Sequence, residues 1–207
     1  MYDEIFSDVK NYLSANEGEV TKIGHFPFRK RSEHIRRVFT WANRLMDDSR
    51  IRDINKDAVL IAALFHDIGY AMLADGMDHA ENSAAIFEKY ADEHGYDRDK
   101  SAFISYLIRS HSMKNLIFAE STPLELIVLM EADLLDETGA LSIIWDCMVE
   151  GAQNEQSFAK TYDHITSYSG RILDENPMFT KKAKEIWTDK QRLVSEFIKQ
   201  LAYDLGE

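Results

Sequence analysis

Histidine and aspartate residues stand at widely separated positions of this 207-residue sequence, several of them next to apolar segments. The adjacent pair His66-Asp67 follows the apolar run from Ala58 to Phe65, where an unpaired carboxylate would be costly to bury. A divalent metal ion accepts imidazole nitrogen and carboxylate oxygen, and it would neutralise such a group. The His66-Asp67 pair therefore indicates a metal site built with other His and Asp residues.

Cysteine contributes little to this chemistry. Cys147 is the only cysteine in the sequence, which excludes an internal disulfide and a zinc site made of several thiolates. Histidine and carboxylate side chains must therefore supply the ligands of any metal.

Apolar periodicity predicts helices that would bring these residues together. One helix opens at His34 and ends near Asp47, and a second covers Ala58 to Phe65. The second is apolar on all sides, which predicts a position in the middle of a bundle. His66 and Asp67 then lie at its buried end.

Three further helices follow in the same way. Asp78 is a predicted N-cap for a helix that begins with His79 and closes near Gly95, and another helix runs from about Asp97 to His111. Residues 122–125, Thr-Pro-Leu-Glu, have the pattern of a capping box for a helix whose inner face includes Asp133.

The remainder of the chain is predicted to be helical as well. Residues 139–207 contain two or three helices broken around Gly151, Gly170 and Pro177, and no alternating strand pattern or linker is found. The expected fold is an all-α helical bundle in a single domain, 1–207. Its metal-binding core covers about 25–145, and C-terminal helices cover 146–207.

Charge and hydropathy limit the partners. Lys and Arg number 24 against 36 Asp and Glu, a formal net charge of −12, so the surface would repel a nucleic acid. The N-terminus lacks the basic and apolar regions of a signal peptide, and no apolar run approaches the ~18 residues of a membrane span. We expect a cytoplasmic protein with no nucleic acid and no membrane as partner.

The order of the candidate ligands resembles the H…HD…D signature of HD superfamily phosphohydrolases. The resemblance lies in three stretches, Arg31-Ser-Glu-His34-Ile-Arg-Arg-Val38, Ala63-Leu-Phe-His66-Asp67-Ile-Gly69 and Glu131-Ala-Asp133-Leu-Leu-Asp136. The segments around His79 and His111 are similar to the intermediate histidine motifs, so that most of 25–145 is covered. The C-terminal helices are similar in layout to small bacterial HD hydrolases of the nucleotide pyrophosphatase type.

This resemblance implies a role for each candidate residue. The implied first metal ligands are His34, His66, Asp67 and Asp133. Asp67 would serve the metal-bound water and could bridge two ions. His79 and His111 would ligate a second metal or bind phosphate, although an exposed first-turn residue and a helix-end residue are equally open readings. Arg37 and Arg109 are the expected substrate-binding residues.

The implied activity is hydrolysis of a phosphoester or phosphoanhydride of a small molecule, with a nucleotide as the expected substrate. One or two divalent metal ions, Mn, Fe, Mg or Zn, would polarise the phosphoryl oxygen and lower the pKa of bound water toward ~7, which makes hydroxide the nucleophile. A homodimer is left open.

At two positions the residue differs from the one found in HD proteins with a similar motif order. Tyr70 stands where cyclic-dinucleotide phosphodiesterases with an HD-GYP domain carry a lysine, and the GYP element is missing, which argues against cyclic-di-GMP hydrolysis. His164 stands where the pyrophosphatase-like relatives tend to carry a lysine, so that their substrate is not transferred to this chain.

Two alternatives to a phosphohydrolase use the same residues. An HD-fold di-iron oxygenase would reveal itself by oxygen-dependent loss of an organic substrate. A non-catalytic nucleotide-sensing HD domain would bind a nucleotide tightly and release no product.

Overall fold

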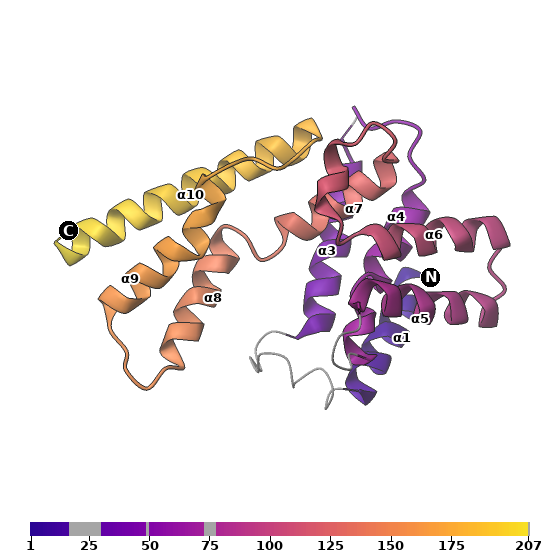
Figure 1. The fold of residues 1–207 in the computed structure, drawn as a ribbon, viewed down its shortest axis with the longest axis horizontal. Coiled ribbons are helices and arrows are strands. Elements are labelled where there is room, and N and C mark those ends of the chain that lie inside the picture. Colours follow the sequence, from indigo (N-terminus) through magenta and orange to yellow (C-terminus); the bar gives the residue numbers. More distant parts are fainter. Residues whose placement is uncertain (17–29, 49, 73–77, 207) are drawn as a thin grey trace. The chain divides into compact units, whose positions relative to one another are not determined.

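The computed structural model describes residues 1–16, 30–48, 50–72 and 78–206, and within these ranges every regular element is a helix (Figure 1). The predicted all-α class is confirmed. Contacts divide the chain into two compact units, Met1–Asp133 and Leu134–Glu207. The single domain over 1–207 stays a prediction, and the start of the predicted core at residue 25 lies outside the described residues.

The first unit contains most of the helices. Its elements are α1 (Tyr2–Ala15), α3 (Arg31–Met46), α4 (Lys56–Phe65), η1 (Ile68–Met72), α5 (His79–Glu93), α6 (Arg98–Ser110), η2 (Lys114–Phe118) and most of α7 (Leu124–Leu135). The helix α1 was not predicted, although Ile5, Val9 and Leu13 recur every four residues and are all buried. That face of α1 packs on α3, α4 and η1.

The helix α4 is the centre of the first unit. Every residue from Ala58 to Phe65 is buried, as the continuous apolar run predicted, and α3 and α6 pack against it. The side chain of Asn55 caps its N-terminus by accepting a hydrogen bond from the backbone N–H of Ala58 at 3.1 Å. The helix ends directly before His66 and Asp67, so these two polar residues lie at the buried C-terminal end of an apolar helix.

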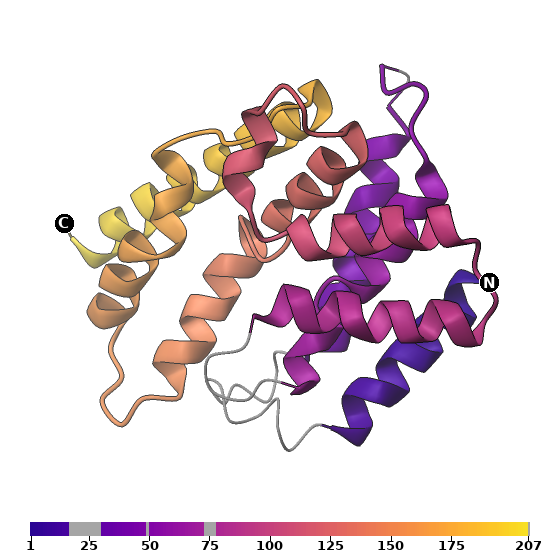
Figure 2. The ribbon, with the colours of Figure 1, turned by 45° about the vertical axis from the view of Figure 1, so that its right-hand side comes forward.

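The helices α5 and α6 lie side by side and antiparallel (Figures 1 and 2). The predicted N-cap Asp78 is confirmed, and Asp97, near which the next helix was expected to begin, caps α6. The carboxylate of Asp78 accepts from the backbone N–H of Ala80 at 2.8 Å, and that of Asp97 accepts from Asp99 and Lys100. The antiparallel arrangement brings the start of α5, with His79, next to the end of α6, with His111.

The predicted capping box of α7 is wrong. The Thr122 hydroxyl donates to the carbonyl oxygen of Leu116 at 2.7 Å, and the Glu125 carboxylate accepts from the backbone N–H of Asn55 at 2.9 Å. Both side chains thus bind to other segments rather than to each other's backbone, because tertiary partners compete with the local cap. The helix begins at Leu124, one residue after Pro123, which was expected to be its first residue.

The second unit contains the end of α7, then α8 (Ala140–Gly151), α9 (Phe158–Ser167), η3 (Ser169–Leu173) and α10 (Lys181–Leu205). The breaks predicted around Gly151, Gly170 and Pro177 fall at the end of α8, within η3 and between η3 and α10. The core of this unit includes Ile165 and Trp187, whose indole N–H donates to the carbonyl oxygen of Glu175 at 2.9 Å. Among the described residues, none of the helices has the length and apolar character needed to cross a membrane.

Candidate metal centre

Four of the predicted ligands converge in the first unit. The Nε2 atoms of His34 and His66 are 3.2 Å apart, and Asp67 Oδ2 lies 3.2 Å from the first and 3.6 Å from the second. Asp133 Oδ1 lies 3.4 Å from His34 Nε2 and 3.8 Å from His66 Nε2. The ends of α3, α4 and α7 thus bring ligand atoms of His34, His66 and Asp133 within 4.8 Å of one another, and Asp67 Oδ2 lies beside the two histidine nitrogens.

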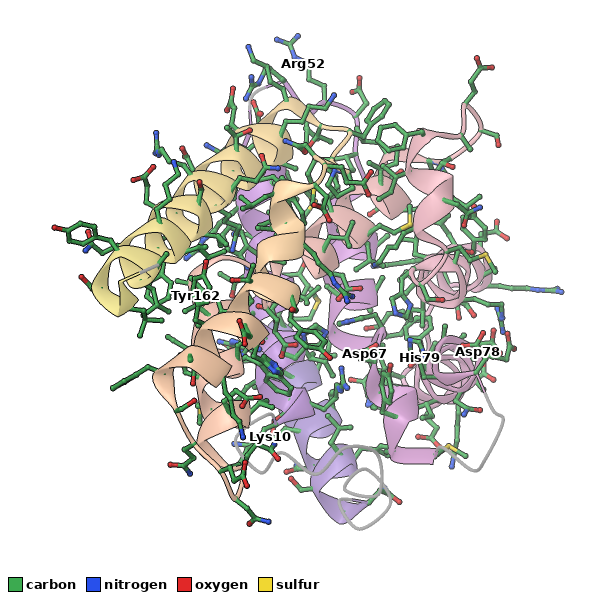
Figure 3. All side chains as sticks on the ribbon, turned by 60° about the vertical axis from the view of Figure 1, so that its left-hand side comes forward. Lys10, Arg52, Asp67, Asp78, His79 and Tyr162 are labelled. Atoms are coloured by element: carbon green, nitrogen blue, oxygen red, sulfur yellow. The ribbon has the colours of Figure 1, made fainter. Side chains whose placement is uncertain are left out.

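A second cluster surrounds the other oxygen of Asp67. Asp67 Oδ1 lies 3.6 Å from His79 Nε2 and 3.4 Å from His111 Nε2, and these two nitrogen atoms are 3.4 Å apart. Figure 3 labels Asp67, which follows α4, next to His79, the first residue of α5. His79 and His111 therefore lie at the cluster rather than on a separate surface, and Asp67 stands between the two clusters.

Backbone carbonyl groups fix the orientation of two imidazole rings. His66 Nδ1 lies 2.8 Å from the carbonyl oxygen of Ala63, and His111 Nδ1 lies 2.6 Å from that of Ile108. An Nδ1–H group that donates to a carbonyl leaves Nε2 as the lone-pair nitrogen of a neutral ring. Each ring therefore presents a metal-ligating atom to its cluster.

The donor atoms fit divalent metal ions. Ligand atoms bound about 2.0–2.2 Å from one ion lie roughly 3.0–3.4 Å from one another. The separations that involve a histidine, 3.2–3.8 Å in the first cluster and 3.4–3.6 Å in the second, need only a sub-ångström adjustment to reach that spacing. Imidazole nitrogen together with carboxylate oxygen suits Mn, Fe and Zn, with Mg preferring the oxygen atoms.

Burial and local charge set the protonation states of the ligands. Burial lowers the pKa of His66 to about 4 and also lowers that of His79, which favours neutral, ligating imidazole. Burial alone would raise the pKa of Asp67, but the surrounding histidines and Arg31 outweigh it and hold that pKa well below its usual range. Burial of Asp133 is likewise outweighed, first by Lys114, so its pKa is lowered too. Both aspartates are therefore ionised.

Two cationic side chains, Arg31 and Lys114, contact these carboxylates. Arg31 Nη1 donates to Asp67 Oδ2 at 2.7 Å, and Lys114 Nζ donates to Asp133 Oδ2 at 2.6 Å. Arg31 precedes His34 by one helical turn, which is a spacing signal for a shared site. Lys114 lies beyond the end of α6 in η2, and the sequence pattern gives no sign that it contacts α7.

The two arginines predicted to bind substrate contact groups other than the ligand carboxylates. The guanidinium of Arg109 donates to Glu81 at 2.6 Å and to Glu88 at 3.1 Å, so a phosphate would have to replace two carboxylates there. Arg37 lines a pocket of about 460 Å³ between α1 and α3, together with Lys10 and Arg36. Their role in substrate binding stays a prediction. His164 contacts Asp146 and Glu150 of the second unit, at 3.4 and 2.8 Å.

A comparison with protein families tests the family assignment that the order of the His and Asp motifs suggested. The HD domain matches residues 31–138, which is more than half of the chain and includes every predicted metal ligand. This chain belongs to the HD domain family. The resemblance inferred from the motif order is thereby confirmed, and family membership supports a hydrolase with a divalent-metal centre.

Solved structures share the fold of this HD-domain chain. A predicted HD superfamily hydrolase from an uncultured Thermotogales bacterium is 24% identical with a TM-score of 0.66, covering 98% of this chain and 92% of that one. An HD-superfamily hydrolase from Bacillus thuringiensis is 20% identical with a TM-score of 0.70, covering 99% and 96%. YpgQ of Bacillus subtilis, in a complex with ADP, is 21% identical with a TM-score of 0.67, covering 98% and 94%. A search of curated proteins finds no match to the sequence.

Proposed function

We propose that this HD-domain chain is a metal-dependent phosphohydrolase that cleaves a phosphoester or phosphoanhydride bond of a small molecule, with a nucleotide as the substrate class. The placement of Asp67 carries the proposal. Its Oδ2 faces His34 and His66, and its Oδ1 faces His79 and His111. One carboxylate with imidazole nitrogens at each oxygen suits two adjacent divalent ions, and the sequence itself left one or two open.

The side chains of the first unit perform distinct tasks in this proposal. His34, His66 and Asp133 would hold a first ion with Asp67, while His79 and His111 would hold a second. A bound ion supplies Lewis-acid polarisation of a phosphoryl oxygen and acidifies a water molecule. The burial of His66, Asp67 and His111 limits the access of bulk water, which strengthens every charge interaction at the centre.

The local charge favours an anionic substrate at this place. The protein as a whole carries a formal charge of −12, but Arg31 and Lys114 stand directly beside the two ligand carboxylates. Metal ions and these two cations would together attract a phosphate group where the rest of the surface repels it. The ADP bound to YpgQ, which has the same fold, supports a nucleotide as the substrate class.

The first experiment is a survey of phosphate and pyrophosphate release from nucleoside mono-, di- and triphosphates with added Mn²⁺. We expect release from at least one nucleotide, abolished by EDTA and restored by the metal. The Asp67→Asn variant should bind no metal and release neither phosphate nor pyrophosphate. Asp92 is an exposed aspartate of α5, and Asp92→Asn should behave as the wild type. Release that persists in EDTA or in Asp67→Asn would contradict the proposal.

Iron content, oxygen consumption and nucleotide binding, measured beside this survey, separate the two alternatives that use these residues. A di-iron oxygenase is favoured by the same six donors, His34, His66, Asp67, His79, His111 and Asp133. It predicts iron near two atoms per chain, oxygen consumption and no phosphate release. A nucleotide-sensing domain predicts tight nucleotide binding with neither product.

A further inference from the structure

The two cations at the centre contact different kinds of carboxylate oxygen. Lys114 Nζ lies 2.6 Å from Asp133 Oδ2, whereas the oxygen that faces His34 and His66 is Oδ1, at 3.4 and 3.8 Å. Lys114 thus occupies the oxygen that points away from the histidines. It leaves Oδ1 available as a metal ligand, and it restricts the rotation of the carboxylate that would replace one oxygen by the other.

Arg31 contacts an oxygen that faces the histidines. Its Nη1 donates to Asp67 Oδ2 at 2.7 Å, and this same Oδ2 lies 3.2 Å from His34 Nε2 and 3.6 Å from His66 Nε2. Where Asp67 ligates an ion held by these two histidines it does so through Oδ2, and that ion would then lie close to the guanidinium. Two cations on one oxygen repel each other and compete for its lone pairs. Arg31 is therefore a competitor of the ion, which Lys114 is not.

An aromatic ring supports the guanidinium next to this oxygen. Arg31 Cζ lies 4.0 Å from the centroid of the Tyr70 ring, and Tyr70 stacks on His79 with centroids 4.5 Å apart and an interplanar angle of 22°. The guanidinium and the His79 ring thus both pack against the Tyr70 ring. The guanidinium can slide on this ring without losing its cation–π contact, and its five N–H donors suit a phosphate group.

We propose that Arg31 and Lys114 act on the centre with opposite sign: Arg31 competes with the first ion for Asp67 Oδ2 and binds the substrate phosphate once displaced, whereas Lys114 positions Asp133 Oδ1 for that ion. This inference rests on the proposed metal-dependent function. Arg31 is in this account a substrate-binding catalytic residue, and Lys114 is a positioning residue that acts through Asp133.

The test measures Mn²⁺ affinity without substrate, by the EPR signal of free Mn²⁺, in EDTA-treated and desalted protein. Arg31→Gln should bind Mn²⁺ about tenfold more tightly than the wild type, and Lys114→Gln about tenfold more weakly, the size of one charge-assisted hydrogen bond. Matched controls are Arg36→Gln, on the same helix and paired with the exposed Asp3, and Lys89→Gln, paired with Glu93. Both should leave the affinity unchanged.

Charge-conserving variants provide a second readout on the nucleotide found to be hydrolysed. Arg31→Lys keeps the positive charge but not the planar fork, so it should raise KM with little change in kcat and little change in Mn²⁺ affinity. Lys114→Arg should restore the Mn²⁺ affinity lost in Lys114→Gln. If either glutamine variant fails to fold, as judged by circular dichroism, the uncharged methionine variant at the same position takes its place in the Mn²⁺ measurement, with the same expected direction.

The outcomes separate this inference from the proposed function. Mn²⁺ affinity that moves in the same direction in Arg31→Gln and Lys114→Gln, or in neither, overturns the inference and leaves the metal-dependent hydrolase in place. A wild-type protein that binds Mn²⁺, Fe²⁺, Mg²⁺ and Zn²⁺ at neither cluster overturns the proposed function. Tighter Mn²⁺ binding in Arg31→Gln together with weaker binding in Lys114→Gln, with unchanged controls, supports the inference, and any other pattern overturns it.

Discussion

The backbone N–H of Gly69 donates a hydrogen bond to the Ser83 hydroxyl oxygen at 2.8 Å, and this bond joins η1 to α5. The contact between the two elements is close. A Cβ atom at residue 69 would lie 2.2 Å from the carbonyl oxygen of His79 and 2.5 Å from the backbone nitrogen of Ser83. The absence of a side chain at Gly69 therefore sets how near His79 comes to Asp67, two residues before the glycine.

We expect Gly69→Ala to displace α5 and to remove the second metal site. Overpacking against backbone atoms costs about 1–3 kcal/mol, and the shift would move His79 away from Asp67 Oδ1. Thermal unfolding and metal content measure the two effects. The matched control is Gly151→Ala at the end of α8, where a Cβ would meet no atom within 4 Å. Gly69→Ala with wild-type stability and full metal content would show that this contact does not position His79.

The second unit contains a buried carboxylate that we expect to matter for stability rather than for metal binding. Asp146, 2% exposed, accepts hydrogen bonds from the hydroxyl and the backbone N–H of Ser169. Asp146→Ala would leave these donors without an acceptor, at about 1–3 kcal/mol for each buried group. Asp146→Asn keeps an acceptor oxygen and should cost less.

Urea unfolding, followed by circular dichroism, ranks the two Asp146 variants. Since no predicted ligand lies in this unit, both should keep the metal content of the wild type. A reversed ranking, or metal loss in Asp146→Asn, would be inconsistent with a purely structural role of this carboxylate.

Acid should destabilise the metal-free protein through its buried histidines. Burial lowers the pKa of His66 from 6.5 to about 4, so between these values the unfolded chain binds a proton that the folded chain does not. The free energy of unfolding therefore falls as the pH falls below 6.5, by up to roughly 1.4 kcal/mol per pH unit from this group. His79, whose pKa is also lowered, adds to the same trend.

Urea unfolding of EDTA-treated protein at pH 7, 6 and 5 measures this trend, above the range in which the aspartates titrate. His66→Gln removes one titrating group and should give a shallower dependence. A stability that stays constant or rises from pH 7 to pH 5 would mean that His66 is protonated in the folded state.

Most of the helical framework could be predicted from periodicity and caps. The apolar run that became α4, the N-cap Asp78 and the helix start near Asp97 are local signals, and the structure has them where the sequence placed them. The Thr122 and Glu125 capping box failed because its partners are the distant groups of Leu116 and Asn55, which no local pattern reveals.

The site was predictable to the extent that its residues follow an ordered motif. Six imidazole and carboxylate side chains were found in this way, and the structure brings them together in two clusters around Asp67. The contacts of Lys114 and Arg109 were not predictable, because both depend on how a side chain near the end of α6 turns toward another helix. Pairing between elements is a tertiary property, whereas the motif records only which residues ligate in relatives.

The number of ions bound per chain tests the central role of Asp67 most directly. It is measured by mass spectrometry after reconstitution with Mn²⁺ and desalting, in the wild type, Asp67→Ala and Asp92→Ala. We predict about two ions in the wild type and in Asp92→Ala, and neither ion nor nucleotide hydrolysis in Asp67→Ala with helicity retained. Bound metal with continued hydrolysis in Asp67→Ala would contradict a centre in which this carboxylate joins the two clusters.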